Sequence, residues 1–227
     1  MTALSNWDKY ELLDFLGKGG MGLVYRARDR HLDRVVAIKF VLEANAKMAA
    51  RFLSEARAQS RIDHPNICRV YEVGEVGGRA YIALQFVQGE PLQRIAKRLS
   101  LEEKILVVRD VAAAIQEAHR LGVVHRDLKP SNVMVERTPE GRWFPVVMDF
   151  GLARELAVNP PSADSELVQG TPAYMSPEQA RGDLSVVDRR SDIYSIGRSP
   201  APVFCLSPSG SQSQSPIEAF AQEGGTL

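Results

Sequence analysis

The stretch His125–Asn132 reads H-R-D-L-K-P-S-N, and Asp149-Phe150-Gly151 follows it after a second apolar run. Asp127 stands where a base would accept or orient the proton of an attacking hydroxyl group. Lys129, two residues further on, can neutralise a phosphate group in transfer. Either string alone arises by chance, so the hypothesis of phosphoryl transfer depends on the rest of the chain.

Two further side chains in these segments suit a metal ion. Asn132 and Asp149 offer hard oxygen ligands of the kind that Mg²⁺ prefers. Mg²⁺ retains several of its waters and bridges nucleotide phosphates, so two protein ligands are enough to hold it there. The sequence therefore predicts a magnesium site formed by these two residues.

A glycine-rich segment near the start of the chain fits the pattern G-x-G-x-x-G. Its residues are Gly17, Lys18, Gly19, Gly20, Met21 and Gly22. In dinucleotide-binding folds a helix begins after such glycines, whereas the alternating residues 23–28 predict a strand here. We therefore expect a hairpin folded over phosphates, where glycines let the backbone approach closely. A plain turn with incidental glycines is the alternative, because the pattern alone is weak.

A lysine stands inside the apolar run Val36–Lys39. An ammonium group in such a strand needs an anion and a carboxylate to offset its desolvation. Glu55, on the buried face of a helix expected from about Met48 to Ile62, is the carboxylate that we expect. Glu55 could instead pair with Arg51 one helical turn earlier. The glycine-rich segment upstream favours the interpretation in which Lys39 and Glu55 serve a ligand.

The distribution of apolar residues predicts two lobes. From Tyr10 to about Gln85 the apolar runs are short and strand-like, with one helical interruption. A long half-buried helix is expected to follow, because Ser100 and Glu103 form a capping box. Residues at helical spacing form its expected buried face: Ile105, Val108, Ala112, Ile115 and His119. Short strands are then expected at Asn132–Val135 and Val146–Met148.

Composition limits the classes of function. The 227 residues are 44% hydrophobic, and 28 basic residues balance 28 acidic ones, so no overall charge favours nucleic acid or an anionic membrane. Cys68 and Cys205 lie far apart, which suits a reducing compartment better than a disulfide framework. Neither a secretory signal nor a transmembrane segment is predicted, so we expect a cytoplasmic location.

Taken together, residues 10 to about 197 resemble the Hanks-type, or eukaryotic-like, serine/threonine protein kinases, and most of all the bacterial members. The segment G-T-P-A-Y-M-S-P-E, which includes Thr171, and Lys129 are similar to the serine/threonine branch. The resemblance implies a two-lobe α+β fold that uses ATP and Mg²⁺. It also implies protein substrates with serine or threonine acceptors.

The resemblance implies a role for each matching residue. It assigns Lys39 to the α and β phosphates, Glu55 to Lys39, Asp127 and Lys129 to catalysis, and Asn132 and Asp149 to magnesium. Leu84 to Val87 would link the lobes. The nucleotide would also lie against a group of residues of the small lobe and this linker: Val24, Ala37, and the backbone of Gln85 and Val87. Ser162 and Ser165 are the expected acceptors of self-phosphorylation, although an unmodified loop serine is the alternative.

Two departures from the resemblance carry expectations of their own. Gln59 is polar where the family places an apolar side chain, which we expect to loosen the helix. After Gly197 the sequence changes character, so we expect an incomplete large lobe. The resemblance implies that Glu178 then loses an arginine partner carried by the missing helices. The expected division is a lead at 1–9, a small lobe at 10–84, a partial large lobe at 85–197 and an unrelated tail at 198–227. A weakly active or inactive module that binds nucleotide or a partner is the alternative function.

Overall fold

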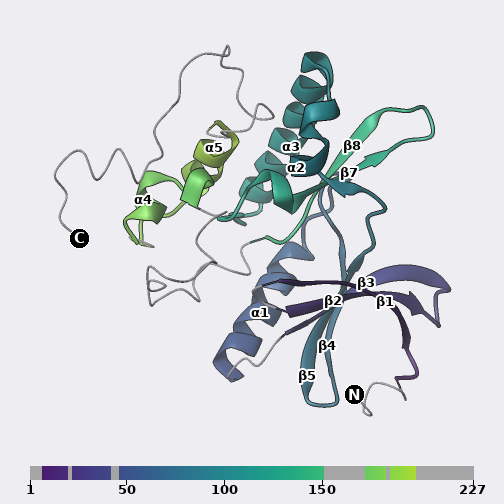
Figure 1. The fold of residues 1–227 in the computed structure, drawn as a ribbon. Coiled ribbons are helices and arrows are strands. Elements are labelled where there is room, and N and C mark those ends of the chain that lie inside the picture. Colours follow the sequence, from purple (N-terminus) through teal and green to yellow (C-terminus); the bar gives the residue numbers. More distant parts are fainter. Residues whose placement is uncertain (1–6, 20–21, 42–45, 151–171, 183–184, 198–227) are drawn as a thin grey trace.

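The computed structural model describes residues 7–19, 22–41, 46–150, 172–182 and 185–197, which form two lobes (Figure 1). The strands are β1 Tyr10–Gly19, β2 Gly22–Asp29, β3 Arg34–Val41, β4 Val70–Val76, β5 Arg79–Gln85, β6 Glu90–Pro91, β7 Val133–Arg137 and β8 Trp143–Val147. The α-helices are α1 Ala46–Gln59, α2 Leu92–Ile95, α3 Leu101–Arg120, α4 Pro177–Ala180 and α5 Arg189–Gly197. Short 3₁₀ helices occupy Ala96–Arg98, Pro130–Asn132 and Pro172–Tyr174.

The small lobe is an antiparallel five-stranded sheet in the order β1-β2-β3-β5-β4. Successive side chains of a strand point to opposite faces, so β3 contributes to two separate clusters. On the outer face Phe40 packs with Tyr10 and Tyr81, and the ring of Trp7 lies 4.6 Å from that of Tyr81. On the inner face Ala37 packs against α1 through Phe52. Lys39, two residues after Ala37, therefore also faces inward.

Helix α1 is fastened to the sheet by Gln59, its last residue. This side chain is 3% exposed, and its Nε2 donates a hydrogen bond of 2.8 Å to the carbonyl oxygen of Cys68. The expectation that a polar group here loosens the helix is wrong, because the amide has a buried backbone partner in the segment that leads into β4. Helix α1 begins two residues earlier than expected and ends three residues earlier.

The large lobe is built around α3, whose start was predicted correctly. Ser100 Oγ accepts a hydrogen bond from Glu103 N, and the Glu103 side chain accepts one from Ser100 N. The expected buried face is partly wrong: the buried residues are Val107, Val111, Ala114, Ile115 and Ala118. Ile105 is 47% exposed. The buried face consists mostly of valines and alanines, because these small side chains let α3 pack closely against β8.

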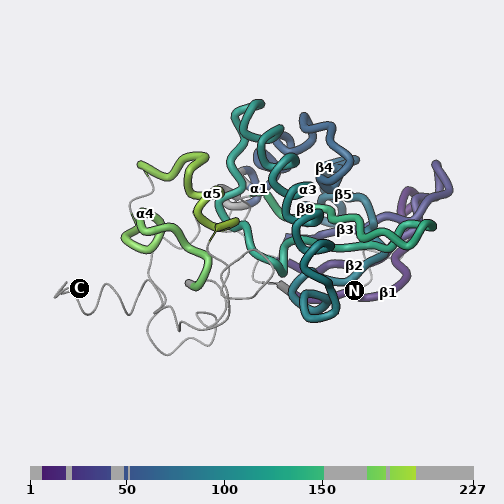
Figure 2. The backbone as a smooth tube through the Cα atoms, turned by 90° about the horizontal axis from the view of Figure 1, so that it is seen from above, coloured from purple at the N-terminus to yellow at the C-terminus, as the bar shows by residue number. Residues whose placement is uncertain are grey.

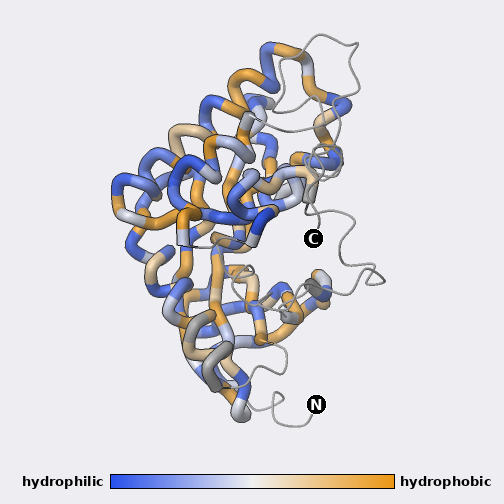
Figure 3. Tube along the Cα trace, turned by 90° about the vertical axis from the view of Figure 1, so that its left-hand side faces the viewer, coloured by the Kyte–Doolittle hydropathy of each residue, from blue (hydrophilic) through white to orange (hydrophobic). Residues whose placement is uncertain are grey.

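Figure 3 shows the same alternation along α3, where hydrophobic and hydrophilic positions change from one side of each turn to the other. Such a pattern is typical of a helix with one buried face. Within the described ranges no helix is long and apolar enough to cross a membrane.

Beyond α3 the chain forms the β7–β8 hairpin; toward its turn, β7 is two residues longer and β8 three residues longer than the strands that the sequence predicts. Its turn is closed by the hydrogen bond from Thr138 N to Arg142 O, and Gly141 adopts a positive φ of 80°. Figures 1 and 2 place α4 and α5 on the side of α3 away from this hairpin. The residues between α3 and β7 therefore lie between α5 and the sheet, at the junction of the lobes.

Candidate active site

The catalytic-loop segment, residues 125–132, is held in place by hydrogen bonds to α5. Asp192 is 1% exposed, and its carboxylate accepts hydrogen bonds from His125 N at 2.8 Å and from Arg126 N at 2.7 Å. The same carboxylate lies 2.7 Å from Nε2 of His119, in the last turn of α3. A buried carboxylate is stable only when such partners replace water. One side chain of α5 thus fixes the end of α3 and the start of the loop together.

Arg126 has an unusual backbone conformation, with φ at 64°. A non-glycine residue in this left-handed region costs of order 1–3 kcal/mol and persists only where its surroundings impose it. Asp192 holds the Arg126 N–H, and Nε2 of Gln179 donates a hydrogen bond of 2.8 Å to the Arg126 carbonyl oxygen. Both the N–H and the C=O of Arg126 are therefore held. This conformation sets the direction in which the side chain of the next residue, Asp127, projects from the loop.

Lys129 and Asn132, which the sequence analysis assigns to the same site, both contact the carboxylate of Asp127. Lys129 Nζ lies 2.8 Å from Asp127 Oδ2, and Asn132 Nδ2 donates to the same oxygen at 3.1 Å. Asn132 Nδ2 also donates to the backbone oxygen of Asp127 at 2.8 Å. The Asp127 side chain is 12% exposed, so it is accessible but firmly oriented.

Asp149 is brought beside this group by the backbone. Met148 N donates to Asn132 O at 2.8 Å, and His125 Nε2 lies 2.9 Å from Met148 O. Asp149 itself has a positive φ of 51°, and 42% of its side chain is exposed. Desolvation by the surrounding protein would raise the pKa of this carboxyl. The Lys39 ammonium outweighs that effect and holds the pKa below its ordinary value, so Asp149 is ionised at neutral pH.

Lys39 forms its ion pair with Asp149: Nζ lies 2.6 Å from Asp149 Oδ1, and the lysine side chain is 9% exposed. The buried ammonium of β3 thus has a carboxylate partner, as the sequence requires, and that partner comes from the large lobe. Glu55 lies on α1, partly buried. Its expected pairing with Lys39 stays a prediction.

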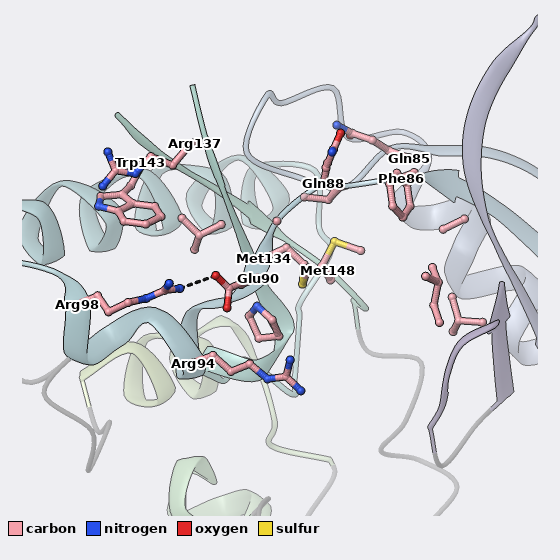
Figure 4. A pocket seen from close by; sticks show the side chains of 17 residues that line it. Gln85, Phe86, Gln88, Glu90, Arg94, Arg98, Met134, Arg137, Trp143 and Met148 are labelled. Carbon is pink, nitrogen blue, oxygen red and sulfur yellow. Dashed lines mark hydrogen bonds and ion pairs between the residues drawn. The ribbon is translucent and has the colours of Figure 1, made fainter. Parts of the chain in front are cut away.

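A cleft of about 1010 Å³ lies between the lobes (Figure 4). Its inner end is apolar, and it includes four of the residues that the resemblance places around a nucleotide: Val24, Ala37, Gln85 and Val87. Met134 and Met148 also line it, and sequence reasoning missed both, because methionines carry no motif. Within the described ranges the N–H and C=O of Val87 have no hydrogen-bond partner, although Val87 is only 6% exposed. A ligand that pairs with both groups fits this position.

The glycine-rich segment forms the β1–β2 hairpin, as expected, with Gly17 to Gly19 in β1 and Gly22 at the start of β2. A Cβ atom at Gly22 would overlap the carbonyl oxygen of Phe40, so only glycine fits there. Gly20 and Met21 lie outside the described residues, as do Ser162 and Ser165. Lys18 is exposed, with its Cα opposite that of Leu23 in the hairpin.

The donor atoms at the site suit Mg²⁺ better than a metal that needs an all-protein cage. The part of the chain that the structure describes gathers no group of three or more His, Cys, Asp or Glu side chains in metal-binding distance. Asn132 uses its Nδ2 for Asp127, and its Oδ1 accepts no hydrogen bond from the described residues. This oxygen and the Asp149 carboxylate fit a hard cation that takes its remaining ligands from water and phosphate.

The comparison with known proteins agrees with this geometry. A family model described as "Protein kinase domain" matches residues 10–220. The chain belongs to this family. The match runs past residue 197, and the division of the chain at that residue stays a prediction.

Relatives of this kinase domain include bacterial serine/threonine-protein kinases. Serine/threonine-protein kinase pkn3 of Myxococcus xanthus is 42% identical over 199 residues, which cover 83% of this chain and 36% of pkn3. Serine/threonine-protein kinase PknB of Mycobacterium leprae is 40% identical over 200 residues, which cover 84% of this chain and 31% of PknB. The chain spans about a third of the length of these curated relatives.

Solved structures confirm the expected two-lobe α+β fold. The kinase domain of Mycobacterium tuberculosis PknI superposes with a TM-score of 0.66 at 28% sequence identity. The superposition covers 92% of this chain and 77% of the PknI chain. The double mutant C20A_R136N of the same domain gives a TM-score of 0.64 over 84% of this chain and 75% of that one.

Proposed function

We propose that this kinase domain transfers the γ-phosphate of ATP to serine or threonine hydroxyl groups of proteins, itself included, with the help of Mg²⁺. The observation that carries the proposal is one cluster: the oriented Asp127 carboxylate with Lys129 and Asn132, next to the Lys39–Asp149 pair. The relatives pkn3 and PknB are named serine/threonine-protein kinases, which supports the same activity here.

Each member of the cluster has a part in this reaction. The acceptor hydroxyl oxygen bonds to the γ-phosphorus while the bond to the bridging oxygen of ADP breaks, and Asp127 orients the hydroxyl and accepts its proton. Lys129, 2.8 Å from Asp127, offsets negative charge on the phosphoryl group in transfer. Lys39 binds the α and β phosphates. Asn132 and Asp149 would hold Mg²⁺, which would supply positive charge to the nucleotide phosphates.

The apolar end of the cleft binds the adenine ring. Val24 and Ala37 lie on the sheet side, with Met134 and Met148 opposite them in the large lobe. The N–H and C=O of Val87, which have no partner among the described residues, pair with the edge of the ring. That edge offers one hydrogen-bond acceptor and one donor. Glu55 supports Lys39 when nucleotide and metal engage Asp149.

The linker depends on a close contact at Gly89, where a Cβ atom would overlap the Val135 carbonyl oxygen of β7. We expect Gly89→Ala to displace the linker, to lower the free energy of unfolding by about 1–3 kcal/mol through overpacking, and to weaken ATP binding. We expect the displaced linker to weaken the binding free energy of ATP by about 1.4 kcal/mol, which corresponds to a tenfold rise in Kd.

Urea unfolding and equilibrium ATP binding measure these effects. Gly197→Ala is the matched control, because a Cβ atom there has nothing within 4 Å. A Gly89→Ala variant that binds ATP as the wild type does would contradict the role given to this contact.

Transfer from radiolabelled Mg·ATP to a generic serine/threonine substrate and to the chain itself tests the proposed function. We expect transfer by the wild type with Mg²⁺ and none with EDTA, and a loss of about 10²–10³-fold in Lys39→Met, as when an electrostatic group at a reacting centre is removed. Lys97→Met, at an exposed lysine, is the control and retains transfer. A cooperatively folded wild type that transfers no phosphate would overturn the proposal.

A further inference from the structure

The cleft extends well beyond the residues that surround the adenine ring. From the linker it continues along Gln88, Gly89 and Glu90, past α2, to the turn end of the β7–β8 hairpin. Its volume of about 1010 Å³ is at the upper end of small-molecule sites, which are roughly 300–1,000 Å³. The outer end therefore has room for something other than the nucleoside.

The outer end is basic. Its charged lining residues are Glu90, Arg94, Arg98 and Arg137. Arg98 Nη2 lies 2.5 Å from Glu90 Oε1, so these two charges offset each other. Arg137 lies over the ring of Trp143, 4.1 Å from its centroid, and donates to Gly141 O. Arg94 remains: within the described ranges it makes neither an ion pair nor a hydrogen bond.

The base of Arg94 is fixed although its tip is free. Its neighbours in α2, Leu92 and Ile95, are both fully buried. Figure 4 shows its guanidinium group turned away from the Arg98–Glu90 pair. A guanidinium group is always charged and presents a planar set of donors that matches a carboxylate or a phosphate group. The side chain is therefore placed to receive an anion from outside the protein.

The nucleotide phosphates are not that anion, because Lys39 and Asp149 are not among the residues that line this cleft. The protein substrate is the remaining source. Helix α2 packs against Pro130–Asn132, the end of the catalytic loop. A substrate with its hydroxyl at Asp127 therefore passes near α2, and extended chain covers about 3.3 Å per residue. A side chain a few residues from the acceptor can reach Arg94.

We propose that Arg94 selects protein substrates that carry an acidic side chain within a few residues of the acceptor hydroxyl. The inference rests on the proposed function, since it assigns the substrate class of the same site. A carboxylate of the substrate replaces water around the guanidinium group and forms paired hydrogen bonds with it.

Two peptides test the inference. Both carry one serine acceptor, flanked on each side by glutamates in one peptide and by lysines in the other. We expect the wild type to prefer the acidic peptide in kcat/KM by about tenfold, a factor that corresponds to 1.4 kcal/mol. We expect Arg94→Glu to reverse the preference, mainly through KM for the peptide. Arg79→Glu, at an exposed arginine of the β4–β5 turn, retains the wild-type preference.

The possible failures are distinguishable. Equal use of the two peptides by the wild type and by Arg94→Glu, with transfer intact, would overturn the inference and leave the proposed function standing. A change in KM for ATP without a change in peptide preference would place Arg94 at the nucleotide and overturn it too. No transfer to either peptide, to a generic substrate or to the chain itself would overturn the proposed function and this inference with it.

Discussion

Asp127→Ala is expected to lower the rate of phosphoryl transfer by about 10²–10⁴-fold, the range that a positioned acid or base contributes. The carboxylate is held by Lys129 at 2.8 Å and by Asn132 at 3.1 Å, and no other carboxylate of the described residues shares these contacts. Its removal leaves the acceptor hydroxyl without an orienting base. The fold should persist, because the backbone of the loop is held independently by Asp192 and Gln179.

Single-turnover transfer measures the chemical step, and the shift of the melting temperature by Mg·ATP shows that the nucleotide still binds the folded protein. Asp127→Asn is the informative comparison, since it retains an oxygen that can orient the hydroxyl but cannot take up its proton. We expect it to lie close to the alanine variant. Transfer within tenfold of the wild type in both variants would show that another group acts as the base.

The local motifs predicted most of the candidate site. Residues such as Asp127 and Asn132 lie five positions apart, and the turn between α3 and β7 is enough to bring them together. Lys39 and Asp149 are 110 positions apart, yet each belongs to a motif with its own chemical signal. The sequence pointed to Glu55 as the carboxylate for Lys39 and did not reveal the contact with Asp149, because nothing in a motif shows that it reaches across from the other lobe.

The parts of the site that the sequence did not reveal are held by hydrogen bonds between residues far apart in the chain. Such bonds leave no periodic pattern in the sequence. Asp192 acts on backbone N–H groups 66 and 67 positions away, so nothing near it in the sequence marks that function. The expected loss of an arginine partner for Glu178 stays a prediction, but its carboxylate accepts a hydrogen bond of 2.5 Å from Ser191 Oγ, a contact that no motif marks. Asp192 lies in the first turn of α5, and a buried carboxylate there needs partners.

The partners of Asp192 make its replacement the second large effect. Asp192→Ala is expected to lower the free energy of unfolding by about 3–5 kcal/mol, because a buried carboxylate is taken away from several hydrogen-bond partners at once. It leaves the N–H groups of His125 and Arg126 and the ring of His119 without the oxygen atoms that they contact. An unsatisfied buried donor costs about 1–3 kcal/mol, so three losses support this estimate.

The same replacement acts on the reaction as well as on stability. Without the carboxylate, the Arg126 N–H loses the oxygen that it bonds to, and we expect the left-handed backbone of Arg126 to relax toward an ordinary φ. Asp127 then moves away from the place where the acceptor hydroxyl binds. Because misplacement by about 1 Å costs on the order of 10²-fold, the fraction of Asp192→Ala that stays folded should transfer phosphate at least that much more slowly.

Urea unfolding gives the stability, and transfer measured at a temperature where the variant is folded gives the rate. Asp188→Ala is the matched control, because that carboxylate lies just before α5 and pairs with Arg190 at the surface. That carboxylate also accepts a hydrogen bond of 2.8 Å from Arg190 N in the first turn of α5, so its removal should lower the free energy of unfolding by about 0.5–2 kcal/mol, as the loss of a helix cap does. Asp192→Asn should lie between the two, since it retains one acceptor oxygen for the two loop N–H groups. If Asp192→Ala were as stable and as active as the control, α5 would have no part in holding the catalytic loop.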